Sequence, residues 1–274
     1  MFKKINIKTV IDITKEAGVA IMALRPKITV SMKSDNSPVT EADKQASDII
    51  MTRLKKLTPD IPVISEEAPQ AENQKIIQNH KTYWITDPLD GTRSYIDGHD
   101  GFGVHLALIH QGVPIMGFVH FPAQGMTYYT GHDQKAYKLD DKHGIPKQIH
   151  VSNANTTPFK AAVNWRKHER PLTINRKKYQ AIPGVGGARL CLAAEGAVDL
   201  AWVEKPFSYW DVAAAHAVLR AAGGDFVDAK FGKSITYGSS KLYIEPSVGG
   251  SPQTLKYVMG FRKANGYRPP SAGI

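Results

Sequence analysis

The sequence has almost no cysteine and no long apolar run. Cys191 is its single cysteine among 274 residues, which excludes a disulfide within the chain and a cysteine-rich metal site. No apolar stretch reaches the roughly 20 residues that a membrane-spanning helix needs. Residues 1–18 are basic, but charged residues break their apolar pattern, so we expect an amphipathic helix there and not a signal peptide. These absences predict a cytoplasmic protein with no membrane partner.

Internal repeats and low-complexity tracts are also missing, and acidic residues are outnumbered. The chain has 35 Lys and Arg against 25 Asp and Glu, a net charge of +10. A positive surface attracts anionic partners, but the basic residues are scattered and the aromatic residues are not interleaved with them as in single-strand binders. A scattered basic surface is equally explained by solubility alone, so charge by itself selects no partner, and nucleic acid is not the partner we expect. A hydrophobic content of 42% is enough to form the core of one large domain or of two smaller ones.

Hydrophobic periodicity predicts the main elements of the first half. Apolar residues at helical spacing indicate helices over residues 5–25 and from Thr40 to residue 57. Residues 61–65 and 82–86 are short β-rich runs, each ending just before acidic residues. Residues 102–137 favour an antiparallel meander that turns at Gln111 and Gly112.

A polar, turn-rich stretch at residues 140–160 predicts a domain boundary. It would separate an α+β half, residues 1–150, from an α/β half, residues 151–274. In the second half we expect a strand near Ala161, a helix near residue 170, strands at 180–184 and 197–203, and helices over 187–195 and from Asp211.

Asp87 and Asp90 stand three residues apart in the segment WITDPLDGT, residues 84–92. Pro88 fixes its own φ and favours an extended conformation at Asp87. A tight turn through Leu89 would then point both carboxylates to one side. Taken alone, the pattern is better explained by a turn that begins at an aspartate and ends at a glycine.

Further acidic residues occur at strand ends and helix starts, and each also has a structural explanation. Glu66 and Glu67 follow a predicted strand and could simply be solvated, whereas Asp43 and Asp211 suit the first turns of their helices. Together the carboxylates form a set of hard oxygen ligands, which Mg²⁺ prefers. No cluster of His and Cys accompanies them, so zinc does not fit. Two or more Mg²⁺ ions sharing Asp87 would offset the repulsion between the carboxylates.

The segments SPVTEAD, ISEE, WITDPLDGT and WDVAAAHAVLRAAGG, in this order, resemble the inositol monophosphatase superfamily of Mg²⁺-dependent, lithium-sensitive phosphomonoesterases. The resemblance covers about residues 5–262 and implies a layered αβαβα fold and a phosphate monoester as substrate. It also implies two or three Mg²⁺ ions, and its members are often homodimers.

The resemblance assigns a role to each matching position. Glu66 would bind the first metal, Asp87 would bridge the metals, Leu89 would offer its backbone carbonyl, and Asp90 and Asp211 would bind the second metal. Thr92, with Asp43 behind it, matches the pair that orients and deprotonates the attacking water. The substrate would contact the amides of Gly91 and Thr92, which receive the phosphate, together with Asp211 and Glu204.

The substrate itself stays open at this point. DPLDGTRSYI and CLAAEGAVDL are similar to the 3'(2'),5'-bisphosphate nucleotidase branch, which converts adenosine 3',5'-bisphosphate to AMP and phosphate. Arg93-Ser94-Tyr95 departs from that branch, and Gly186 and Gly187 replace a serine that is usual near the substrate pocket.

Glu204, seven residues before Asp211, stands where inositol monophosphatases bind an inositol hydroxyl, although a surface residue beside Lys205 is an equal explanation. The alternatives are therefore an inositol or sugar monophosphatase, or an inactive relative that binds phosphorylated ligands or RNA.

Overall fold

The computed structural model describes residues 4–33, 37–152, 160–164, 172–174, 177–184 and 187–265. The helices are α1 (Ile7–Leu24), α2 (Glu41–Leu57), α3 (Gln70–Asn79), α4 (Thr92–Ile96), α5 (Ala188–Ala194), α6 (Tyr209–Ala221) and α7 (Pro252–Asn265), with a 3₁₀ turn at Arg25–Lys27.

The strands form two large sheets and two small ribbons. The first sheet consists of β3 (Val63–Ser65), β4 (Thr82–Asp90), β5 (Gly103–His110), β6 (Val113–Phe121), β7 (Met126–Thr130), β8 (Ala136–Asp140) and β9 (Pro146–Ile149), in that order. The second has the order β11 (Leu172–Ile174), β12 (Lys177–Gly184), β10 (Lys160–Asn164), β13 (Leu200–Val203), β17 (Ser247–Gly250) and β15 (Asp225–Asp228). The ribbons pair β1 (Val30–Met32) with β2 (Pro38–Thr40), and β14 (Phe207–Ser208) with β16 (Tyr243–Ile244).

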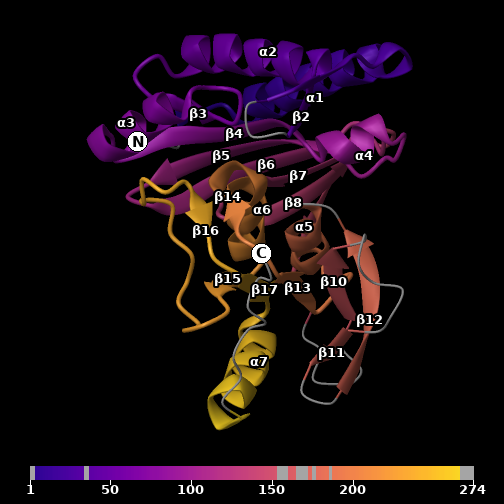
Figure 1. The fold of residues 1–274 in the computed structure, drawn as a ribbon, viewed down its shortest axis with the longest axis vertical. Helices are drawn as coiled ribbons and strands as arrows, with labels where there is room; N and C mark the ends of the chain where they lie inside the picture. Colours follow the sequence, from indigo (N-terminus) through magenta and orange to yellow (C-terminus); the bar gives the residue numbers. More distant parts are fainter. Residues whose placement is uncertain are drawn as a thin grey trace.

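Alternating side chains place helices on both faces of each sheet. On β4, Trp84 packs with α1 and α2, whereas Tyr83 and Ile85 pack with α5 and α6. On β13, Ala201 and Val203 face the same inner helices, and the alternate residues Leu200 and Trp202 pack with α7. Since successive strand residues point to opposite faces, the layers are α1 and α2, first sheet, α5 and α6, second sheet, and α7 (Figure 1). The predicted αβαβα fold is confirmed.

Helix α6 lies close against the first sheet because small residues line the contact. A Cβ added to Gly117 of β6 would lie 2.0 Å from the carbonyl oxygen of Ala214 and 2.8 Å from Cβ of Ala217. The glycine therefore allows the backbones of α6 and β6 to approach each other directly. This close approach sets how far the first turn of α6 lies from the end of β4.

Most elements of the first half were predicted correctly. The helices at 5–25 and 40–57 are α1 and α2, and the meander is β5 to β8, with Gln111 and Gly112 at positive φ in its first turn. Helix α3 was missed, because Ile76 and Ile77 are its only aliphatic residues larger than alanine.

In the second half, β10, β12, α5, β13 and α6 match the predicted elements, and α7 was missed. The helix expected near residue 170 falls mainly on residues 165–171, outside the described residues, and is followed by β11. The first sheet ends at Ile149 and the second begins at Lys160. The division into a metal-binding half and a substrate-binding half stays a prediction. Among the described residues, no helix is both long and apolar enough to cross a membrane.

Candidate metal centre

The carboxyl end of β4 supplies the first acidic residues of the site. Asp87 and Asp90 are both buried, and the register of β4 with β5 shifts between them. Within this irregularity the amide of Leu89 donates to Oδ1 of Asp87 at 2.9 Å. The interruption of regular pairing around Pro88 brings two carboxylates to one strand end, as the sequence predicts.

Gly91 turns the chain from β4 into α4. It has φ +86°, and a Cβ there would lie 2.9 Å from the carbonyl oxygen of Gly101, so both the conformation and the space favour glycine. The turn places Thr92 beside α2. The Thr92 hydroxyl lies 3.0 Å from Oδ1 of Asp43 and 3.1 Å from the carbonyl oxygen of Leu89. Its single proton can be donated to one of these oxygens at a time.

Asp43 is held from the other side by the start of its own helix. The backbone amide and the hydroxyl of Thr40 both donate to Oδ2 of Asp43, at 2.7 and 2.6 Å. This is the capping-box position expected from the sequence. One carboxylate therefore caps α2 through Oδ2 and faces Thr92 through Oδ1, so the structural and the catalytic interpretation of Asp43 are compatible.

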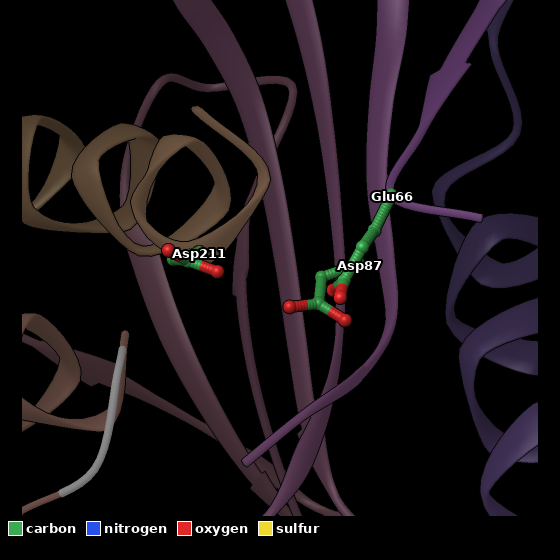
Figure 2. Close-up of side chains that lie close together, drawn as sticks. All are labelled: Glu66, Asp87 and Asp211. Atoms are coloured by element: carbon green, nitrogen blue, oxygen red, sulfur yellow. The ribbon is translucent and has the colours of Figure 1, made fainter. Parts of the chain in front are cut away.

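Three carboxylates from three separate elements meet in one cluster. Glu66 follows β3, Asp87 belongs to β4, and Asp211 lies in the first turn of α6. Each offers an oxygen within 4.8 Å of the others, and Figure 2 shows the side chains converging from the sheet and the helix. The amide of Ser208 donates to Oδ2 of Asp211 at 2.9 Å and fixes that side chain at the helix start.

The cluster is electrostatically unfavourable without a cation. Burial, and then the charges of Glu66, Asp90 and Asp211, raise the pKa of Asp87 well above its ordinary value. Burial, and then Asp90 and Glu66, likewise raise the pKa of Asp211. Carboxylates that repel one another in a dehydrated site and offer only oxygen donors fit a hard divalent cation. The residues present therefore suit the Mg²⁺ ions that the sequence implies.

Lys33 is a site residue that sequence reasoning missed. Its ammonium lies 2.8 Å from a carboxylate oxygen of Glu66 and 2.8 Å from one of Glu67. Burial lowers the pKa of Lys33, but the two carboxylates outweigh burial and raise it. Lys33 follows the short strand β1, and no spacing pattern in the sequence connects it to residues 66 and 67.

A second group, of which sequence reasoning named only Gly187, lies on the α5 side of Asp90. The amide of Gly187 donates to Oδ2 of Asp90 at 3.3 Å, and Nε2 of His105 lies 3.5 Å from the same oxygen. Arg189 is buried beside them and donates to the carbonyl oxygen of Trp202 at 2.7 Å. The signal that could have found His105 is a histidine between apolar residues in the middle of a strand, β5.

The sequence-predicted residues thus fall into three groups. Glu66, Asp87 and Asp211 form the cluster, with Asp90 close enough to raise the pKa of the last two. Asp43, Thr92 and Leu89 form the hydrogen-bonded group beside it. Glu204 lies outside the acidic cluster at the end of β13, near enough to Arg189 to act on its pKa. Its contact with a substrate stays a prediction.

Comparison with known proteins agrees with this geometry. Residues 6–258 match the model of the inositol monophosphatase family. The chain is 35% identical to the 3'(2'),5'-bisphosphate nucleotidase CysQ of Salmonella typhimurium, over 88% of this chain and 97% of that protein. It is 36% identical to CysQ of Escherichia coli K12, over 86% of this chain and 96% of that protein.

Solved structures show the same fold. CysQ from Bacteroides thetaiotaomicron, described as a bacterial member of the inositol monophosphatase family, superimposes with a TM-score of 0.75 at 27% identity, covering 89% of this chain and 96% of that one. An inositol monophosphatase from Thermotoga maritima superimposes with a TM-score of 0.72 at 22% identity, covering 93% and 97%. The family match spans most of the chain and includes every acidic residue of the cluster, so the chain belongs to the inositol monophosphatase family and is a phosphoric monoester hydrolase.

Proposed function

We propose that this protein is a Mg²⁺-dependent 3'(2'),5'-bisphosphate nucleotidase that hydrolyses adenosine 3',5'-bisphosphate to AMP and phosphate. The observation that carries the proposal is a complete acidic cluster in a chain that is similar, over nearly its whole length, to proteins named as such nucleotidases. The net charge of +10 suits a doubly phosphorylated substrate better than a neutral sugar that carries one phosphate.

The residues that would hold Mg²⁺ are Glu66, Asp87, Asp90 and Asp211, with the carbonyl of Leu89. Bound there, the ions would supply positive charge to the phosphate oxygens and to the leaving oxygen. The chain's own work is to place the groups before reaction, because a preorganised site does not have to reorient in the transition state.

Thr92 and Asp43 would handle the proton of the attacking water. The hydroxyl oxygen of Thr92 orients the water and accepts the proton that the water releases. The hydroxyl passes its own proton to Oδ1 of Asp43, 3.0 Å away. The water oxygen forms a new bond to phosphorus while the bond from phosphorus to the 3' oxygen breaks, and the leaving oxygen takes up a proton from solvent water. No phosphoenzyme is formed. The amides of Gly91 and Thr92, at the turn into α4, would receive the phosphate.

Metal binding and leaving-group binding would be divided between the two halves of the chain. Residues 1–150 contain Asp43, Glu66, Asp87, Asp90 and Thr92, whereas residues 151–274 contribute Asp211 and the surroundings of Arg189 and Glu204. We propose that the first half carries the metal-binding and water-activating groups and that the second half binds the leaving group. Cytoplasmic location and a homodimer stay predictions, and light scattering on the purified protein tests the second.

An inositol or sugar monophosphatase is the second candidate, and Glu204 is the observation that favours it. Glu204 lies at the end of β13, close to Arg189. A role for its carboxylate in binding a hydroxyl group of the substrate can therefore be tested. The third candidate, an inactive relative, is disfavoured because the chain retains Thr92, Asp43 and all the acidic residues of the cluster.

Phosphate release separates these candidates. The purified protein is assayed with Mg²⁺ on adenosine 3',5'-bisphosphate and on inositol 1-phosphate, with EDTA and with added Li⁺ as parallel conditions. We expect release from the nucleotide, little from inositol 1-phosphate, none with EDTA, and inhibition by Li⁺. A preference for inositol 1-phosphate would assign Glu204 to the substrate and overturn the nucleotidase proposal. Release from neither compound would support the inactive relative.

A further inference from the structure

His105 is a buried histidine whose ring nitrogens have no hydrogen-bond partner among the described residues. It lies on β5 and is 0% exposed, and neither Nδ1 nor Nε2 is hydrogen-bonded within the part of the chain that the structure describes. Buried polar groups are almost always paired, so a buried imidazole beside an acidic cluster requires a reason. Nε2 of His105 lies 3.5 Å from Oδ2 of Asp90.

Gly187 makes the room for this ring. A Cβ at Gly187 would lie 2.7 Å from Cε1 of His105, closer than carbon atoms can pack, so any larger residue would displace the imidazole. The backbone amide of the same glycine donates to Oδ2 of Asp90 at 3.3 Å. One glycine at the start of α5 therefore provides a donor to Asp90 and leaves the space that the histidine fills.

Both groups approach the same carboxylate oxygen. The amide of Gly187 and the imidazole of His105 face Oδ2 of Asp90 and come from different segments, the residue before α5 and strand β5. With its proton on Nε2, the imidazole can donate to Oδ2 after a small movement that shortens the 3.5 Å contact. Oδ1 is then the oxygen that Asp90 offers to a cation.

We propose that His105 is a positioning residue that, together with the amide of Gly187, holds Oδ2 of Asp90 so that the carboxylate is preoriented for Mg²⁺. This inference rests on the proposed function, since it assigns Asp90 to the metal site. Outer partners of this kind fix the orientation of a ligating carboxylate, and their loss weakens metal affinity by about 10- to 100-fold.

Mg²⁺ binding to the purified protein, measured by titration calorimetry without substrate, tests the proposal. We expect His105→Leu, which keeps the bulk and removes the donor, to weaken Mg²⁺ binding by about 10- to 100-fold. His105→Gln places an amide donor near the position of Nε2. This variant should bind Mg²⁺ with an affinity close to that of the unmodified protein. If His105→Leu does not fold, as judged by near-UV circular dichroism, His105→Met serves the same comparison.

His120 provides a matched control on the opposite face of the first sheet. It is 3% exposed, its Nδ1 lies 3.0 Å from the hydroxyl of Thr127, and a Cβ at Gly18 would lie 2.7 Å from its Cδ2. His120→Leu therefore removes a similarly buried imidazole packed against a glycine, but on the sheet face opposite to that of His105 and Gly187. It should lower stability and leave Mg²⁺ affinity unchanged.

Two results would overturn the inference. One is unchanged Mg²⁺ affinity in folded His105→Leu, and the other is equal weakening in His105→Leu and His105→Gln, because the volume of the ring and not its donor would then matter. If the unmodified protein bound no Mg²⁺ at all, the proposed function would fall together with this inference. The titration of the unmodified protein therefore distinguishes the two failures.

Discussion

Replacing Asp43 by asparagine tests the proton path more sharply than any other single change. Aspartate and asparagine side chains have the same shape, so the start of α2 and the turn into α4 should keep their positions. What changes is one oxygen, which becomes an NH₂ group that can donate and cannot accept. The structure determines which of the two oxygens is replaced.

The asparagine can take two orientations, and the contacts of Asp43 favour one of them. Oδ2 receives two donors from Thr40, whereas Oδ1 faces the single hydroxyl of Thr92. An NH₂ group placed at Thr40 would confront its backbone amide, and leaving that buried donor unpaired costs about 1–3 kcal/mol. The NH₂ group should therefore point at Thr92. The hydroxyl must then give its proton to the carbonyl of Leu89, 3.1 Å away, and no carboxylate is left to accept it.

The expected result is an almost inactive protein that still folds. Loss of a general base lowers the rate by about 10²- to 10⁴-fold, so phosphate release from adenosine 3',5'-bisphosphate should fall by that factor in kcat. Removing an acid from the first turn of α2 costs about 0.3–1 kcal/mol, which corresponds to a fall in Tm of no more than about 4 °C. Mg²⁺ affinity should change little, because Asp43 lies behind Thr92 and outside the acidic cluster.

Asp48→Asn is the control, since Asp48 is exposed on the same helix. This variant should retain full activity. The double variant Asp43→Asn with Thr92→Ala should lose no more activity than the more damaging single variant, because the two residues act as one unit. A wild-type kcat in Asp43→Asn, or fully additive losses in the double variant, would refute the proton path.

Three further changes probe the charge, the packing and the pH dependence of the fold. Asp87→Asn should abolish Mg²⁺ binding yet raise the Tm of the metal-free protein, since burial and the neighbouring carboxylates raise the pKa of Asp87; a lower Tm contradicts this. Gly117→Ala should cost about 1–3 kcal/mol in urea unfolding, because its Cβ would lie 2.0 Å from the carbonyl oxygen of Ala214; unchanged stability and activity would mean that α6 can move away freely. Burial lowers the pKa of His120 from 6.5 to about 4. As the pH falls below 6.5 the unfolded chain binds the proton and the folded protein does not, so protonation favours unfolding. The stability associated with neutral His120 is therefore full above pH 6.5 and is lost as the pH falls towards 4, by up to about 1.4 kcal/mol per pH unit. Urea unfolding at pH 7 and pH 5 should show a smaller difference in His120→Gln than in the unmodified protein, and an equal difference argues against this assignment.

Sequence patterns predicted the parts of the site that are set locally. Asp87 and Asp90 are joined by one turn, and their convergence follows from Pro88 and Gly91. Asp43 and Asp211 each follow a residue that can cap a helix, so their place in a first turn can be read from the spacing. The meeting of these local groups in one cluster came from the family resemblance, because periodicity alone does not place α6 beside β4.

The residues that were missed depend on contacts between distant segments. Lys33 meets Glu66 across the end of a short ribbon, and His105 meets Gly187 across 82 positions of the chain. Neither pair leaves a repeat, a spacing or a change in composition. Helix α3 was missed for a related reason. It is stabilised by the tertiary packing of a few apolar residues, and its sequence has no strong helical pattern.

The placement of the acidic residues also bears on how such a protein can acquire new substrates. Four of the carboxylates and Thr92 belong to the first sheet and its helices, and Asp211 is joined to them by the close contact of α6 with β6. Loops and strands of the second sheet can then change in evolution without disturbing water activation. A single hydrolytic apparatus can in this way be inherited unchanged while the leaving group it accepts diverges from one lineage to the next.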